Sequence, residues 1–287
     1  MQIHSKRQTL IVAHRGASHA APENTLPAFR LAIEEDADFI EGDFWLTKDR
    51  HIVCIHDPDT ARVSCTHSKL DVRSSTLRQL KALELGECQG KQFKGTSIPT
   101  LPEILKILPP EKGIFLEIKD PRTLFLEKLL PIARRYGLTP DRMRLIAFDP
   151  EVIRRAREYF PQHKIYWLYN WYLAKETGLL SNSPKEILKI LRLLPCDGLN
   201  LNPAPWIDID FVRQLRKMNM DFCVYNVNHF DDALKLITLG VDAIATNYPA
   251  KMRAQIARYF APAPVSRKKA EQVSLNKGQI DFKNTFE

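Results

Sequence analysis

Residues 143–160 read MRLIAFDPEVIRRAREYF and contain one complete unit of the predicted fold. The run at 143–148 is short and mostly apolar, which indicates a buried strand. The run at 151–160 carries apolar residues at helical spacing. A strand followed closely by a helix is the building unit of a parallel sheet, so this stretch predicts an α/β protein.

The same alternation extends outward in both directions, from near the N-terminus to about residue 261. Strands are predicted at Leu10–Ala13, Phe39–Leu46, Ile114–Lys119, Met143–Phe148, Lys164–Tyr169, Gly198–Asn202, Phe222–Val227 and Ala243–Thr246. Helices are predicted at Thr25–Asp36, Leu101–Leu108, Leu124–Tyr136, Glu151–Phe160, Lys185–Leu194, Asp210–Met218, Phe230–Leu239 and Ala250–Phe260, with Asn24 as the N-cap of the first. Eight such pairs predict a single (β/α)8 TIM barrel. The alternative is an open doubly wound sheet, which normally has a Gly-rich phosphate turn after its first strand, and HRGASHAAPEN lacks that pattern.

Two segments interrupt the alternation. Residues from about 57 to 99 are too many for a strand-to-helix loop, so we expect a small insertion between the second strand and the second helix, capping the barrel mouth. From residue 262 to 287 the chain is polar and has no apolar period. The prediction is therefore a barrel domain over 1–261 and a disordered tail that is dispensable for turnover.

Charge and cysteine content narrow the class of protein. The formal net charge is +8, which suits phosphate-bearing ligands, nucleic acid or an anionic membrane surface and does not choose among them. The five cysteines contain no CxxC pair, so we expect reduced thiols and no zinc cluster. The sequence has no apolar run long enough for a signal peptide or a membrane span, which favours a cytoplasmic protein.

Polar residues cluster where the predicted strands end, which is where barrel enzymes place their chemistry. Glu41 and Asp43 share one face of the second strand because strand side chains alternate, and Glu117 and Lys119 repeat this spacing on the third. His14 and Arg15 directly follow the first strand, and His56 follows the apolar run at 52–55. Taken singly, Glu41 and Asp43 also fit a solvated edge. Glu117 and Lys119 also fit a structural ion pair, and His14 also fits a core histidine.

Three carboxylates directed into one barrel mouth repel one another unless a cation lies among them. Oxygen ligands suit a hard divalent ion, so Glu41, Asp43 and Glu117 predict a site for one Mg²⁺ or Ca²⁺. The histidines His14 and His56 suit proton transfer near neutral pH. Arg15 and Lys119 suit a phosphate group.

The motifs together resemble the glycerophosphodiester phosphodiesterase family. They are HRG at 14–16, PENT at 22–25, EGD at 41–43, HD at 56–57, LEIK at 116–119, IPTLPEIL at 98–105 and GVDAIATNYP at 240–249. The resemblance covers roughly residues 10–255 in the family's order, and the place of the insertion matches as well.

The resemblance implies hydrolysis of a glycerophosphodiester to sn-glycerol 3-phosphate and an alcohol. It implies metal ligation by Glu41, Asp43 and Glu117, acid–base catalysis by His14 and His56, and phosphate binding by Arg15 and Lys119. Glu23 is expected to support the site, and the aromatic ring of Tyr225 to line the glycerol position. Two positions depart from the family pattern: Tyr225-Asn226-Val227-Asn228 stands where Trp-Thr-Val-Asn is common, and Asn247 stands where an Asp is usual.

Two other functions stay open from the sequence. A lysophospholipase D or sphingomyelinase D-like enzyme needs an apolar groove, for which the candidate residues are Phe44, Trp45, Trp167, Trp171 and Trp206. A non-catalytic module that binds phosphate or nucleic acid has no need for acid–base histidines. The sequence contains both His14 and His56, so no nucleic-acid partner is expected. Arg267, Lys268 and Lys269 predict at most a weak contact with a membrane surface. Nothing in the sequence predicts the oligomeric state.

Overall fold

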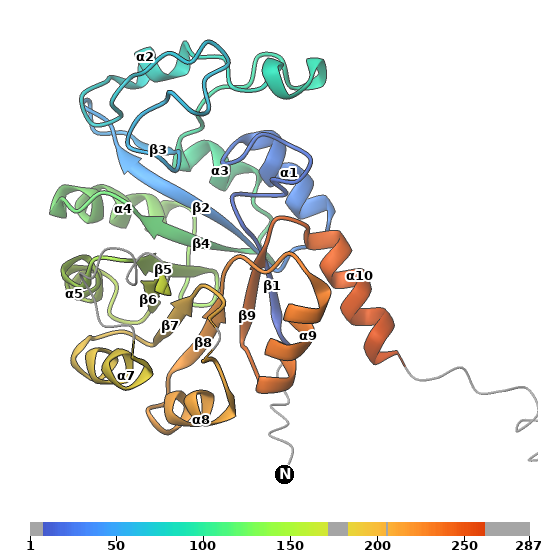
Figure 1. Ribbon diagram of the computed structural model, residues 1–287. Helices are drawn as coiled ribbons and strands as arrows, with labels where there is room; N and C mark the ends of the chain where they lie inside the picture. Colours follow the sequence, from blue (N-terminus) through green and yellow to red (C-terminus); the bar gives the residue numbers. More distant parts are fainter. Residues whose placement is uncertain (1–7, 172–182, 205, 262–287) are drawn as a thin grey trace, which may run out of the picture.

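The computed structural model describes residues 8–171, 183–204 and 206–261, and within them eight strands form a closed parallel barrel (Figure 1). In order around the barrel the strands are β1 (Leu10–Ala13), β2 (Phe39–Leu46), β4 (Gly113–Ile118), β5 (Met143–Ala147), β6 (Lys164–Tyr169), β7 (Gly198–Leu201), β8 (Asp221–Val224) and β9 (Ala243–Thr246). Each strand pairs in parallel with the next, and β1 pairs with both β2 and β9, which closes the ring. The predicted (β/α)8 barrel is confirmed.

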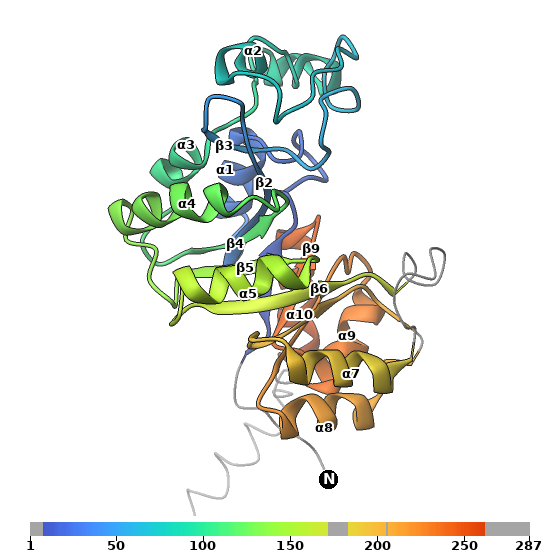
Figure 2. The same ribbon diagram turned by 90° about the vertical axis from the view of Figure 1, so that its left-hand side faces the viewer.

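Helices surround the barrel and alternate with its strands (Figures 1 and 2). They are α1 (Leu26–Glu34), α3 (Leu101–Ile107), α4 (Thr123–Arg135), α5 (Pro150–Tyr159), α7 (Pro184–Leu193), α8 (Ile209–Lys217), α9 (Phe230–Leu239) and α10 (Pro249–Phe260). In α5 the Asp149 side chain accepts a hydrogen bond from the Glu151 backbone N–H, which caps the helix start. The helix then buries Val152, Ile153 and Ala156 on one face. Faces of this kind form the main core between the helices and the barrel.

Successive residues of each barrel strand point alternately outward and inward. On β7, Leu199 and Leu201 pack outward in the main core, whereas Asn200 faces the barrel interior. The lower interior is filled by a second apolar cluster that includes Phe39, Phe115 and Tyr166. The interior is therefore closed below and carries its polar side chains toward the carboxyl ends of the strands.

The insertion after β2 has a small core of its own. It begins with β3 (Ile52–Cys54), which pairs antiparallel with β2, and continues through α2 (Leu77–Lys81) and the 3-10 turns η1 (Glu87–Gln89) and η2 (Lys91–Phe93). Its buried residues are Val53, Ile55, Val72, Leu80, Leu85 and Ile98. Figures 1 and 2 both place α2 at the end of the molecule away from α7 and α8.

The cysteine prediction was wrong for two of the five residues. Cys65 and Cys88 form a disulfide, with their Cα atoms 5.3 Å apart, and Cys54, Cys196 and Cys223 are free and buried. The pair escaped prediction because 23 positions separate the two residues in sequence and the fold of the insertion alone brings them together.

Two local predictions were also wrong. The N-cap of α1 is Thr25 rather than Asn24, whose side chain turns toward β2. The strand predicted at Phe222–Val227 is shorter in the structure, where β8 ends at Val224. The polar tail lies outside the described residues. Among the described residues, no helix has the length and apolar character needed to cross a membrane.

Candidate active site

The candidate site lies at the carboxyl ends of the barrel strands, around a cavity of about 230 Å³. Six of the seven residues predicted to hold the metal, bind the phosphate or transfer protons line this cavity: His14, Arg15, Glu41, His56, Glu117 and Lys119. Asp43, which is 1% exposed, lies beside them and forms ion pairs with Arg15 and Lys119. The fold therefore brings all seven of these residues into one region.

The turn that follows β1 depends on a glycine. Gly16 has a φ of +82°, and a Cβ there would lie 2.6 Å from the backbone carbonyl carbon of Ala28 in α1. Only glycine permits this left-handed conformation and this close approach together. The turn directs the backbone N–H of Arg15 to Glu41 Oε2, at 2.9 Å.

The three carboxylates form one compact, buried group. Each offers an oxygen within 4.8 Å of the others, and Glu41 and Glu117 are only 4% and 7% exposed. The register between β2 and β4 places Asp43 directly opposite Glu117, and Glu41 precedes Asp43 on the same face of β2. This is the convergence that the spacing of the sequence predicted.

Burial and mutual repulsion make this group unfavourable when it is fully ionised. Burial raises the pKa of Glu41 well above its ordinary value, and the neighbouring Asp43 and Glu117 raise it further. Burial likewise raises the pKa of Glu117 to about 8, against the opposing effect of Lys119. Burial also opposes ionisation of Asp43, but Lys119 and Arg15 outweigh it and hold the pKa of Asp43 well below its usual range.

The carboxylate group fits a divalent cation. Glu117 Oε1 is buried and has Lys119 Nζ as its ion-pair partner at 2.6 Å, and Lys119 also pairs with Asp43. One ammonium and one guanidinium face three buried carboxylates, so a hard cation among these oxygen ligands would relieve their remaining repulsion. Glu41, Asp43 and Glu117 are the residues that could hold it.

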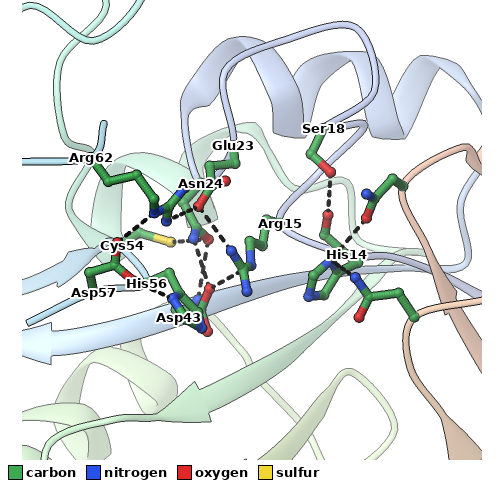
Figure 3. A network of polar contacts seen from close by, with 12 residues as sticks. His14, Arg15, Ser18, Glu23, Asn24, Asp43, Cys54, His56, Asp57 and Arg62 are labelled. Carbon is green, nitrogen blue, oxygen red and sulfur yellow. Dashed lines mark hydrogen bonds and ion pairs between the residues drawn. The ribbon is translucent and has the colours of Figure 1, made fainter. Parts of the chain in front are cut away.

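Asn24 holds Asp43 in place (Figure 3). Its Nδ2 donates to Asp43 Oδ2 at 2.8 Å, and its Oδ1 accepts from the Asp43 backbone N–H at 3.2 Å. Asn24 is 3% exposed, so both hydrogen bonds are shielded from water. This pairing explains why Asn24 does not cap the helix.

His14 contacts two amide side chains through Nδ1. Asn247 Oδ1 lies 2.9 Å away and Asn226 Nδ2 lies 3.1 Å away. The first contact requires a proton on Nδ1 and leaves Nε2 as an acceptor, whereas the second requires the other tautomer. Burial, assisted by the positive charge of Arg15, lowers the pKa of His14 to about 4, so its imidazole is neutral at pH 7.

His56 has an acidic partner instead. Its Nδ1 lies 2.6 Å from Asp57 Oδ1, and its backbone carbonyl accepts from the indole N–H of Trp45 at 3.2 Å. Burial lowers the pKa of His56, while the carboxylates of Asp43 and Asp57 oppose that shift. The two histidines therefore differ in environment: neutral amides surround the Nδ1 of one, and a carboxylate holds the Nδ1 of the other.

A chain of ion pairs links the insertion to the barrel mouth (Figure 3). Arg62 of the insertion donates from Nε to Asp57 Oδ2 at 2.6 Å and from Nη2 to Glu23 Oε1 at 2.7 Å. Glu23 in turn accepts from Arg15 Nη1 at 3.0 Å. Glu23 thus contacts Arg15 on one side and Arg62 on the other, and its supporting role stays a prediction.

The walls of the cavity include aromatic rings, but not the five that the sequence suggested for a lipid groove. Phe115, Phe148 and Tyr225 line the cavity, and Phe148 lies edge to face with Tyr225 at 6.5 Å. Phe44 and Trp167 are buried in the main core, Trp45 packs on the insertion, and Trp171 and Trp206 pack against the main core. None of these five candidate residues is among the described residues that line the cavity.

Several residues of the site were missed or left without a role. Asn24 lies in the PENT motif, Asp57 lies in the HD motif, and Asn247 departs from the family pattern. Their contacts with Asp43, His56 and His14, respectively, form only in the tertiary fold and leave no signal in the sequence. Arg62 carries no sequence signal, because the insertion has no regular period. Asn200, at an inward position of β7, was read only as part of a strand.

A family model and several related proteins match most of this chain. The model of the glycerophosphoryl diester phosphodiesterase family matches residues 14–251. The chain is 32% identical to YhdW of Bacillus subtilis over 83% of this chain and 94% of that protein. It is 31% identical to the glycerophosphodiester phosphodiesterase of Caldanaerobacter subterraneus subsp. tengcongensis, over 84% and 95% respectively.

Among solved structures, an Oleispira antarctica phosphodiesterase in complex with the product sn-glycerol-3-phosphate shares the fold with a TM-score of 0.74. It is 24% identical, and the match covers 86% of this chain and 96% of that one. The family match spans every predicted site residue and most of the barrel. This chain belongs to the glycerophosphoryl diester phosphodiesterase family.

Proposed function

We propose that this protein hydrolyses glycerophosphodiesters to sn-glycerol 3-phosphate and an alcohol, with one divalent cation, Mg²⁺ or Ca²⁺, in its site. The observation that carries the proposal is the buried carboxylate group with two cations and two histidines at one cavity. The relative from Caldanaerobacter and the product-bound Oleispira structure support the same substrate class.

Glu41, Asp43 and Glu117 would hold the cation, which would offset the mutual repulsion of the buried carboxylates. When bound, the cation supplies Lewis-acid polarisation of the phosphodiester and lowers the pKa of a hydroxyl nucleophile. With the three carboxylates ionised, the cation, Arg15 and Lys119 bring the local charge to +1. That charge complements a single phosphodiester anion.

Arg15 and Lys119 would bind the phosphate. Both already face Asp43, with Arg15 Nε and Lys119 Nζ each 3.3 Å from its carboxylate. A cation shared by the carboxylates would weaken these ion pairs and leave both side chains free to donate to phosphate oxygens. Glu23 keeps Arg15 in position during that exchange.

His14 and His56 would move the protons. One accepts the proton of the substrate's own 2-hydroxyl as that oxygen attacks phosphorus, and the other protonates the departing alcohol. Water then opens the resulting cyclic phosphate, with the two roles exchanged. His14 follows β1 and His56 follows β3, and both side chains line the same cavity as Arg15 and Lys119.

A panel of diesters tests the substrate class. We expect glycerophosphocholine, glycerophosphoethanolamine and glycerophosphoglycerol to release sn-glycerol 3-phosphate, because the charged groups of the site face the shared phosphoglyceryl portion. Enzymatic detection of sn-glycerol 3-phosphate measures release, with lysophosphatidylcholine as the comparison substrate. Turnover of the lysolipid alone would contradict the proposal.

Metal affinity is expected to depend on pH. The Glu117 carboxyl, with its pKa raised to about 8 by burial, must lose its proton when the cation binds. The affinity for Mg²⁺ should therefore rise from pH 6 to 8, by up to about tenfold per pH unit for each proton that binding releases. Titration calorimetry in buffers of different ionisation enthalpy measures both the affinity and the released proton. An affinity that does not change over this range would contradict the assignment of Glu117.

A further inference from the structure

The cavity does not end at the charged residues but continues into the barrel interior. Below the mouth it is lined by apolar side chains that face inward from five strands: Val12, Ile146, Leu168, Cys223 and Ala245. Ala243 and Ala245 on β9 and Cys223 on β8 are small, so this side of the barrel leaves open space. The charged mouth and the apolar interior form one continuous cavity.

One polar group stands in this apolar part. Asn200 lines the cavity from β7 and is 4% exposed. Its Oδ1 is buried and has no hydrogen-bond partner among the described residues. Buried polar atoms are nearly always paired, so an unpaired acceptor that lines a cavity indicates a donor on whatever occupies the cavity.

The neighbouring strands do not supply a strong donor. The parallel register places Leu168 of β6 on one side of Asn200 and Cys223 of β8 on the other. Leucine has no donor, and a neutral thiol is a weak one. The buried thiol stays neutral because burial raises the pKa of Cys223 well above its ordinary value.

We propose that Asn200 is a specificity residue whose Oδ1 accepts a hydrogen bond from the terminal hydroxyl of the substrate's glyceryl group. This inference rests on the proposed function and deepens it. The phosphate stays at the mouth with Arg15 and Lys119, and the hydroxymethyl end of the glyceryl group enters the interior. The carbon atoms of that end contact Ile146, Leu168 and Ala245. The subsite then selects diesters with a free primary hydroxyl and rejects those with an acyl chain on that oxygen.

The test compares two choline diesters that differ only in the hydroxymethyl group. Glycerophosphocholine has it, and 2-hydroxyethyl phosphocholine keeps the attacking hydroxyl but lacks it. We expect kcat/KM of the natural chain to favour the glyceryl substrate by at least about tenfold, because a site built to bind a hydroxyl rejects the analogue that lacks it. In Asn200→Ala the preference should fall toward parity through loss on the glyceryl substrate alone.

Two further variants separate specificity from folding. Asn200→Leu keeps the branching of the side chain but removes the acceptor, so it should lose the preference as Asn200→Ala does. Asn202→Ala changes the same residue type on the same side of the barrel, where Asn202 Oδ1 accepts from the Trp171 backbone N–H and does not line the cavity. Asn202→Ala should keep the preference for the glyceryl substrate even if it lowers stability. Thermal unfolding measures the stability of each variant.

The outcomes distinguish this inference from the proposed function. If the natural chain hydrolyses neither diester, the proposed function fails. If it hydrolyses both equally, or if Asn200→Ala and Asn200→Leu keep the full preference, only the role of Asn200 fails. A loss of equal size on both substrates would show that Asn200 binds structural water or supports the barrel, and it would also overturn the inference.

Discussion

Replacing His14 or His56 with alanine is expected to lower kcat on glycerophosphocholine by about 10²–10⁴-fold, the usual effect of removing a general acid or base. The two side chains lie at the same cavity but have different partners, with amides at the Nδ1 of His14 and Asp57 at the Nδ1 of His56. Neither is a proposed metal ligand, so both variants should bind Mg²⁺ as the natural chain does. Steady-state kinetics and titration calorimetry measure the two effects separately.

A good leaving group identifies the acid of the first step. Nitrophenolate needs little protonation, so the variant that lacks the general acid should recover activity on a glycerol nitrophenyl phosphodiester, and the other variant should not. His51→Ala is the matched control, because His51 is exposed and pairs with Asp49 outside the cavity. Near-normal rates of both variants on natural substrates would refute the acid–base assignment.

Replacing Glu41 or Glu117 with glutamine should weaken Mg²⁺ binding by at least about 100-fold and abolish turnover at ordinary metal concentrations. Loss of a supporting contact alone costs a metal site 10- to 100-fold, so loss of a ligand should cost no less. Without metal, the glutamine variants should be at least as stable as the natural chain, since each substitution removes one of three carboxylates that repel one another.

The measurement is thermal unfolding with and without Mg²⁺. The natural chain should gain stability with metal concentration, because a ligand that binds only the folded state stabilises it. The variants should not gain. Glu127→Gln, on the exposed face of α4, is the control and should behave as the natural chain does. Full metal-dependent stabilisation of Glu41→Gln and Glu117→Gln would contradict the proposed ligand set.

The barrel was predictable because its determinants are local. The strand at Lys164–Tyr169 is a short apolar run, and the helix at Phe230–Leu239 has apolar residues at helical spacing, and both have the bounds that the sequence predicted. The convergence of Glu41 and Asp43 follows from strand alternation alone. Its extension to Glu117 requires that β2 and β4 be neighbours, which the order of elements in a barrel supplies.

The contacts that depend on irregular chain were not predictable. The insertion has no period to indicate how it folds, so neither the Cys65–Cys88 disulfide nor the ion pair of Arg62 with Glu23 was foreseen. Asn24 was taken for a helix cap because its residue type and position suit one. Its competing hydrogen bonds with Asp43 arise only when α1 packs beside β2.

The central proposal is that glycerophosphodiester hydrolysis here requires a divalent cation held by Glu41, Asp43 and Glu117. The most direct test is release of sn-glycerol 3-phosphate from glycerophosphocholine by protein dialysed exhaustively against EDTA, before and after addition of Mg²⁺ or Ca²⁺. We predict that activity disappears after dialysis and returns with one of the two cations, at a stoichiometry of one bound ion per chain. Full activity of the dialysed, metal-free protein would contradict the proposal.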